Sequence, residues 1–190
     1  QYITRSISNR ADQLSIQAKT LSQHNVIASK LSNLSLQLYS NLLRTGYIKN
    51  DVELKEINDY FYAKLPKYDF STLGFREKLW LYKVHLWHSV LRQDFLLTYK
   101  YATKWQQLFT NDVKNIKVHP VFYLKGKNYL LESLFFLKHY EKFKKELAFF
   151  EYEIQQEIIT VNSNTEILMF LYYYSNQLHL HFLEGSFEEG

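Results

Sequence analysis

Glycine and proline are scarce in this chain, and that scarcity restricts its fold more than any other feature. The 190 residues include 5 Gly and 2 Pro, whereas average composition would give about 13 and about 10. Tight turns, β-bulges and glycine-rich phosphate-binding loops depend on these residues, so the chain has little material for them. Hydrophobic residues make up 46% of the sequence, which excludes a disordered chain. We therefore expect an all-α protein.

Apolar residues recur at helical spacing rather than at the alternating spacing of strands. The two clearest series, with intervals of three or four residues, are Leu31, Leu34, Leu38 and Leu42, and Leu79, Tyr82, Leu86 and Val90. Such intervals place side chains on one face of a helix. Segments rich in polar residues or containing proline, at 22–25, 66–74, 110–120 and 161–165, indicate breaks between helices. The predicted helices cover residues 2–21, 26–44, 51–64, 75–92, 95–110, 120–137, 140–160 and 165–183.

A short pattern of leucine, polar residues and an aromatic residue occurs four times. The copies are Leu43-Arg-Thr-Gly-Tyr47, Leu91-Arg-Gln-Asp-Phe95, Leu137-Lys-His-Tyr140 and Leu183-Glu-Gly-Ser-Phe187. Their leucines are 48, 46 and 46 residues apart, which indicates a repeat of two helices. We predict one helical-repeat domain over residues 1–190, with a half repeat at 1–22, repeats at about 23–70, 71–117 and 118–162, and an incomplete repeat at 163–190. Because both ends fall within a repeat, we expect a segment of a longer array.

The turn sequences resemble those of the tetratricopeptide repeat (TPR) family. Gly185-Ser-Phe187-Glu-Glu-Gly190 is similar to the family's turn, and Tyr140-Glu-Lys-Phe143 keeps its aromatic residue. The period of about 46 residues exceeds the family's 34, and bulky residues such as Leu86 and Leu131 stand where the family has small ones. The resemblance implies a right-handed superhelical array of antiparallel helix pairs, a TPR-like α-solenoid. A HEAT-like or unrelated array of helical hairpins is the structural alternative.

The sequence offers little for catalysis, metal binding or membrane insertion. It contains no Cys, so it has neither disulfides nor a thiolate zinc site. His85 and His88 share a helix face but have no acidic residues nearby, and no nucleophile or phosphate-loop motif occurs. The longest apolar run, 167–174, is far shorter than the roughly 20 residues of a membrane span. We expect a cytoplasmic protein that is not an enzyme, binds no metal or cofactor and does not contact a membrane.

Polar residues recur on the first helices of the repeats. When these helices are aligned on their final leucines, three of the four carry polar residues two and six positions upstream, and these candidates for peptide or protein binding are Gln37, Asn41, His85, Ser89, Gln177 and His181. Positions four apart share a helix face. The TPR resemblance implies that first helices line a concave groove for an extended peptide. The predicted function is a non-enzymatic protein- or peptide-binding scaffold, with a peptide-sensing regulatory module as the alternative.

Charge is distributed unevenly along the chain. Residues 1–145 contain 23 Lys and Arg and 11 acidic residues, a net charge of +12, whereas residues 146–190 contain eight Glu and no Lys or Arg. The basic part favours an acidic protein or peptide as partner. Lysines alternate with aromatic residues between 114 and 145, a pattern that also suits nucleic acid, so nucleic-acid binding is a second alternative. The candidate residues of this basic patch are Lys125, Lys127, Lys138, Lys142, Lys144 and Lys145.

Overall fold

The computed structural model describes the backbone of residues 2–185, and the side chains of Arg10 and of residues 13–185. These residues form α-helices, one short 3-10 helix and no β-strand, so the prediction of an all-α chain is confirmed. The elements are α1 (Tyr2–Thr45), α2 (Asp51–Lys64), η1 (Phe70–Thr72), α3 (Phe75–Leu91), α4 (Phe95–Thr110), α5 (Lys114–Val118), α6 (Pro120–Phe136), α7 (Tyr140–Gln155) and α8 (Ser163–Glu184).

One predicted break is wrong, because α1 continues without interruption through residues 22–25. This segment, Ser22-Gln-His-Asn25, contains no Gly or Pro. Each of its polar residues costs a helix only about 0.5–0.7 kcal/mol relative to Ala. The following turns are anchored by Ala28, Leu31 and Leu34, which are buried against the body, and the helix extends outward from them. Short helices η1 and α5 also form within segments predicted to be loops.

The four repeated leucine-to-aromatic segments are the C-terminal ends of α1, α3, α6 and α8. Each contains one residue in the left-handed backbone region, Gly46, Gln93, Lys138 or Gly185, with φ between 54° and 77°. After α3 and α6 the next amide closes a six-residue turn, from Asp94 N–H to the Ser89 carbonyl and from His139 N–H to the Leu134 carbonyl. The repeat seen in the sequence is therefore a helix-terminating turn. The part of the TPR-like turn at 186–190 lies outside the described residues.

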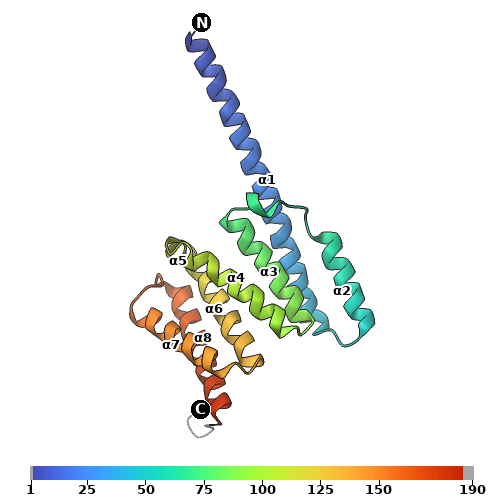
Figure 1. Cartoon of the computed structure of the whole chain (residues 1–190), viewed down its shortest axis with the longest axis vertical. Coiled ribbons are helices and arrows are strands. Elements are labelled where there is room, and N and C mark those ends of the chain that lie inside the picture. The colour runs from blue at the N-terminus through green and yellow to red at the C-terminus, as the bar shows by residue number, and fades with distance from the viewer. Residues whose placement is uncertain (1, 186–190) are drawn as a thin grey trace.

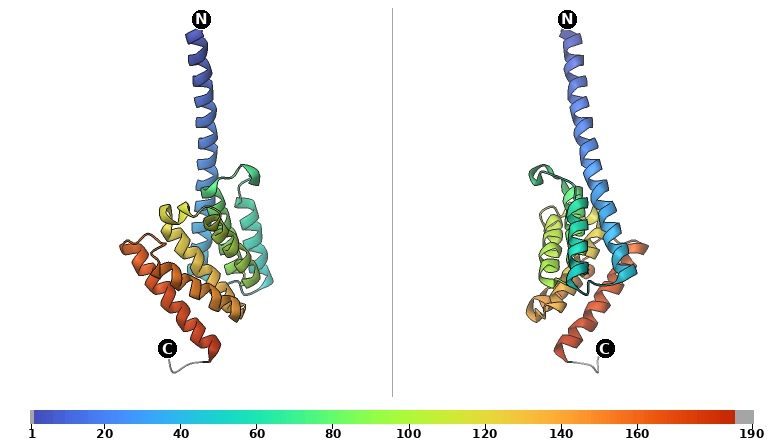
Figure 2. Two further views of the ribbon diagram at one scale, coloured as in Figure 1. Left: turned by 60° about the vertical axis from the view of Figure 1, so that its left-hand side comes forward. Right: turned by 90° about the vertical axis from the view of Figure 1, so that its right-hand side faces the viewer.

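Figures 1 and 2 show how the helices pack against one another. Helix α3 packs against α1 and α4, α4 against α6, and α8 against both α6 and α7. Tight connections reverse the chain after α3 and α6, so that α4 and α7 run back along the helices they follow. One hydrophobic cluster joins α1, α2 and α3, and a second extends from α3 to α8. Val90 and Tyr129 pack against both clusters.

The first half of α1 stands clear of this body (Figure 1). Every described side chain from Arg10 to Gln23 is exposed, and the first buried side chain of the helix is Ala28. The exposed residues include Leu14, Ile16 and Leu21. The helix thus has an embedded half and a projecting half, and the projecting half, residues 2–23, makes no buried contact through its described side chains.

Helices α4 and α6 approach closely at Gly126. A Cβ on this residue would lie 2.6 Å from the Gln106 amide nitrogen and 2.7 Å from the Trp105 ring. The same two side chains donate hydrogen bonds to the backbone of α6, Trp105 Nε1 to the Phe122 carbonyl at 3.1 Å and Gln106 Nε2 to the Tyr123 carbonyl at 3.0 Å. Glycine is therefore required here by the approach of side chains from α4.

Gly126→Ala should lower the free energy of unfolding by about 1–3 kcal/mol, because the added methyl displaces Trp105 and Gln106. In an open helix the same change would raise stability by about 1 kcal/mol. Urea denaturation of both proteins measures the difference. Ala148→Gly, at an exposed position of α7, reports the ordinary cost of glycine in this protein. A Gly126→Ala protein more stable than the parent would contradict the packing argument.

Candidate functional site

Several helices line one cleft of about 620 Å³. Helix α1 lines it with Leu36 and Tyr39, α3 with Lys83 and Trp87, and α8 with Tyr172. The largest share comes from α6, through Lys125, Asn128, Tyr129, Glu132, Ser133 and Phe136. Phe95 and Thr98 of α4 also line it, so five helices meet at one concave surface, which we call the central cleft.

Aromatic rings form a continuous row along the central cleft. Tyr39 lies 4.9 Å from Trp87, and Trp87 lies 5.7 Å from Tyr129, measured between ring centroids. Behind the cleft, Tyr129 lies 5.9 Å from Trp105, which is fully buried. Tilted and edge-to-face pairs at these distances stabilise aromatic packing. The Trp87 indole N–H is buried, and no described residue accepts a hydrogen bond from it. The row supplies rigid apolar walls.

Two lysines and one carboxyl group set the charge of the central cleft. Burial lowers the pKa of Lys83 to about 8, and the nearby charge of Lys125 acts in the same direction. Burial raises the pKa of Glu132, opposed by a 2.8 Å hydrogen bond from the Asn128 amide. At pH 7 Lys83 is therefore still largely protonated. An acidic ligand would relieve the repulsion between the two lysines.

The floor of the central cleft joins α6 to α8 through side-chain amides. Asn176, which is fully buried, donates to Asn128 Oδ1 at 2.9 Å and to the Tyr172 carbonyl at 2.7 Å. Asn128 in turn donates to Glu132. A connected polar group of this kind fixes the rotamers of its members. Glu132 is thereby held in place by α8 as well as by its own helix.

The six residues predicted to line a groove do not share one surface. Gln37 and Asn41 line a different cleft, of about 940 Å³, which lies between α1, α2 and the loop joining them. Gln37 accepts a 2.5 Å hydrogen bond from the Tyr60 hydroxyl there. Gln177 is half-buried on α8 and donates to the Tyr173 hydroxyl at 2.8 Å, and His181 is also half-buried on that helix.

The two predicted groove residues on α3 face its neighbours instead. Ser89 is fully buried, donates to the Leu86 carbonyl and accepts from Thr98, so it is not accessible to a peptide. His85 stacks on Tyr101 with ring centroids 4.5 Å apart. Burial lowers the pKa of His85 to about 4, helped by nearby lysine charges, so the ring is neutral at pH 7.

The basic patch predicted from sequence is divided by the fold. The expectation that Lys127 belongs to a surface patch is corrected, because its side chain is buried and paired with carboxylates. Lys125 lies in the central cleft, and Lys144 pairs with Glu184 at 3.1 Å. Lys138, Lys142 and Lys145 are exposed. Nucleic-acid binding stays a prediction that depends on the lysines still at the surface.

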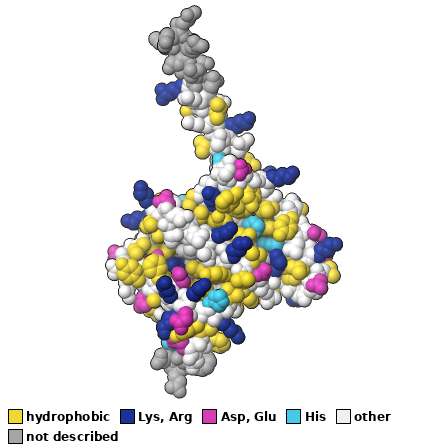
Figure 3. Space-filling view, viewed as in Figure 1, with side chains coloured by type: hydrophobic (Ala, Val, Ile, Leu, Met, Phe, Trp, Pro, Cys, Tyr) yellow, Lys and Arg dark blue, Asp and Glu magenta, His cyan; other side chains and the backbone are white. Residues whose placement is uncertain are grey.

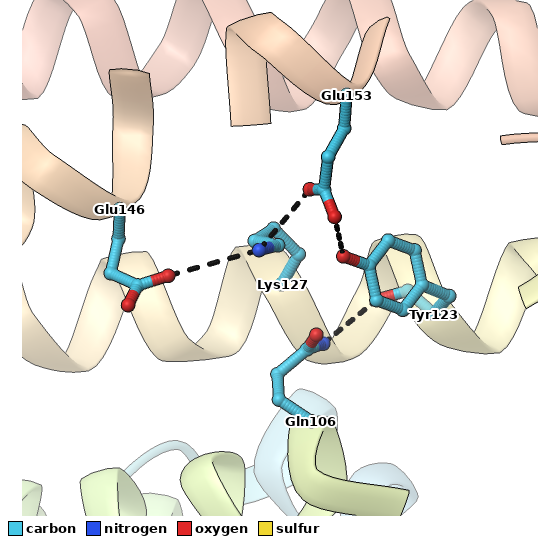
Figure 4. A network of polar contacts seen from close by, with 5 residues as sticks. All are labelled: Gln106, Tyr123, Lys127, Glu146 and Glu153. Atoms are coloured by element: carbon cyan, nitrogen blue, oxygen red, sulfur yellow. Dashed lines mark hydrogen bonds and ion pairs between the residues drawn. The ribbon is translucent and has the colours of Figure 1, made fainter. Parts of the chain in front are cut away.

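Lys127 belongs to a buried polar network between α4, α6 and α7 (Figure 4). Its ammonium lies 3.2 Å from Glu153 and 3.7 Å from Glu146. Glu153 also accepts a hydrogen bond from the Tyr123 hydroxyl. Burial raises the pKa of Tyr123, and the charge of Glu153 raises it further. Desolvated charges of this kind need their partners, so we assign the network to structure.

Of the residues that line the central cleft, Lys125 was a candidate from sequence, whereas the aromatic residues and Lys83 were not. Trp87 and Tyr129 have the spacing of core residues, and Lys83 was not distinguished from other surface lysines. Glu132 did carry a signal, because it is the one charged residue in the run from 128 to 137. An isolated carboxyl group in an apolar helix is either buried with a partner or placed for function.

Among the described side chains, those of Arg10 and residues 13–185, no group of three or more His, Asp or Glu is placed to hold a metal ion. No helix within residues 2–185 is both long and apolar enough to cross a membrane. Comparison with known proteins identifies no family, since no family model, curated protein or solved structure matches the chain.

Removing Lys127 should destabilise the protein strongly, because Glu153 would stay buried without its cation. We expect Lys127→Met to lower the free energy of unfolding by about 3–5 kcal/mol. Adding Glu153→Gln should restore at least about 2 kcal/mol, because the neutral amide still accepts from Tyr123. Urea denaturation at pH 7 measures both. A double variant no more stable than Lys127→Met would show that the ion pair is not the cause.

Glu132 should make stability depend on pH. Its folded pKa is raised above the unfolded value, so the folded state holds the proton more tightly and stability falls as pH rises from about 4.5 through the folded pKa. Glu132→Gln should therefore be more stable than the parent at pH 8, with the difference disappearing near pH 4. Thermal unfolding across this range tests it. Glu141→Gln, at an exposed position, is the control for removing one carboxylate from the surface, and identical profiles for parent and Glu132→Gln would contradict the assignment.

Proposed function

We propose that this chain is a non-enzymatic scaffold that binds a protein or peptide segment on the concave face of a TPR-like array of helix pairs. The observation that carries the proposal is the central cleft, to which α1, α3, α6 and α8 all contribute. In a helical array, first helices stacked side by side form an extended concave surface. A ligand in this cleft would contact several repeats at once.

The lining of the central cleft suits an extended segment with acidic and aromatic or aliphatic residues. Tyr39, Trp87 and Phe136 offer rings for apolar side chains, and aromatic anchors of this kind dominate the binding energy of protein interfaces. Lys83 and Lys125 favour a carboxylate.

A regulatory version of this function, in which a bound peptide changes the curvature of the array, has a specific observation in its favour. Val90 and Tyr129 line the central cleft and pack against both hydrophobic clusters. A ligand touching these residues would contact both halves of the body. It would shift their relative position to the extent that it binds one arrangement more tightly than another. Small-angle scattering with and without a bound peptide separates this version from a passive scaffold.

Peptides selected on the intact chain from a random phage-displayed library should depend on the rim of the central cleft. We expect Tyr39→Ser and Phe136→Ser each to weaken binding at least tenfold, about 1.4 kcal/mol, in isothermal titration calorimetry. Tyr62→Ser removes a comparably exposed ring from α2 and should leave the affinity unchanged.

The same peptides distinguish the two clefts. Gln37→Ala combined with Asn41→Ala changes only the cleft between α1 and α2, so loss of binding in that variant alone would move the site there. Equal binding by all variants, or a library that yields no binder, would contradict the proposal.

A further inference from the structure

Helix α8 has a large apolar surface on the side that faces away from the body. Five of its residues, between 49% and 62% exposed, form a stripe along the helix: Ile167, Phe170, Leu171, Tyr174 and Leu178. Its opposite side is also apolar or buried, through Thr165, Met169 and Asn176. A helix at the surface of a globular protein normally turns charged and polar residues outward. We call these five residues the α8 stripe.

The surroundings of the α8 stripe are acidic. A hollow of about 320 Å³ beside it, between α7 and α8, is lined by Glu151 and Glu166 together with Phe170, Tyr173 and Tyr174. Residues 146–190 carry eight Glu and no Lys or Arg. A partner that covers the stripe therefore needs an apolar face bordered by basic side chains.

The projecting half of α1 has these properties. Leu14, Ala18 and Leu21 follow one another at intervals of four and three residues, so they form a line on one face of the helix. Arg10 continues this line one turn earlier, and Lys19 lies beside it. Figure 3 shows basic and hydrophobic side chains on this projection. We call Leu14, Ala18 and Leu21 the α1 stripe.

An isolated helix with this composition gains little stability from its own sequence. Helices without tertiary contacts are marginal in water even when rich in alanine, and residues 13–25 are dominated by Ser, Gln, Asn and Thr. The projecting half therefore needs a packing partner in order to be stable.

We propose that the projecting half of α1 in one copy of this chain packs on the α8 stripe of a second copy. Residues 2–23 and α8 both contain 22 residues, so the two helices match in length at about 33 Å. Figure 1 places the projection at one end of the molecule and the C-terminal end of α8 at the other. While α1 is one continuous helix, its projecting half cannot reach the α8 of its own copy, and the contact is therefore head-to-tail.

A head-to-tail contact uses two different surfaces and leaves one of each unoccupied at the ends of an assembly. Such heterologous contacts produce rings when the rotation closes and open chains when it does not. The parent protein should therefore form species larger than a dimer as its concentration rises.

Sedimentation velocity over a range of concentrations tests this contact with two complementary variants. Leu14→Glu with Leu21→Glu changes the α1 stripe, and Phe170→Glu with Leu178→Glu changes the α8 stripe. Each variant alone should be monomeric at concentrations where the parent associates, with the dissociation constant raised at least tenfold. Their equimolar mixture should give a 1:1 dimer and nothing larger, because one intact surface of each kind is left.

The control is Val52→Glu with Leu96→Glu, which changes two residues that are at least as exposed but lie outside both stripes. This variant should associate as the parent does. Dimer formation in the mixture also shows that both stripe variants are folded, since a misfolded chain would not restore the contact.

Other arrangements give different results. Association that survives the α8 variant would indicate α1 pairing with α1 and would overturn the proposal, as would association that survives the α1 variant. A parent that stays monomeric at all concentrations would also overturn it and would leave the stripe to another protein or to a further segment of a longer chain. A second measurement uses the absence of native cysteine: Ala18→Cys in one copy and Tyr174→Cys in another should form an intermolecular disulfide, whereas Ala18→Cys with Leu96→Cys should not.

Discussion

The contact between α4 and α6 holds the centre of this molecule. Trp105 and Gln106 donate hydrogen bonds to backbone carbonyl groups of α6, which in most helices accept only from N–H groups of the same helix. The two side chains reach those carbonyls because Gly126 has no side chain. On its other side α6 carries Lys127, which ties α7 to the body through Glu146 and Glu153. Helix α3 packs on α4, and α7 and α8 pack on α6, so the positions of all three depend on this contact.

The central cleft and the buried network lie on different sides of α6 and show two uses of polar groups in an apolar setting. The network is closed, since Lys127, Glu153 and Tyr123 satisfy one another, and a satisfied buried network gives a unique packing rather than reactivity. In the cleft, by contrast, Lys83 and Lys125 repel each other and the Trp87 indole has no acceptor among the described residues. This difference is the reason that we propose the central cleft, and not the network, as the recognition surface.

Much of the fold could be predicted from sequence because helix formation here is a local matter. The shortage of Gly and Pro and the three-to-four spacing of apolar residues gave the helices, and the repeated leucines marked left-handed turns such as those at Gln93 and Lys138. The break expected at 22–25 did not form, since weak helix formers do not stop a helix that is anchored further along. The site was harder to predict. Trp87 has the pattern of a core residue, and sequence does not reveal that Lys127 faces carboxylates from α7.

The unbroken course of α1 also has a mechanical consequence. Its 44 residues span about 66 Å, and the same helix that projects from the body carries Tyr39 on the wall of the central cleft. Once its projecting half is packed on a partner, α1 would act as a lever that pivots at the packed segment around Leu31 and Leu34. A load on the projecting half would then tilt the wall of the cleft that carries Tyr39 relative to α6.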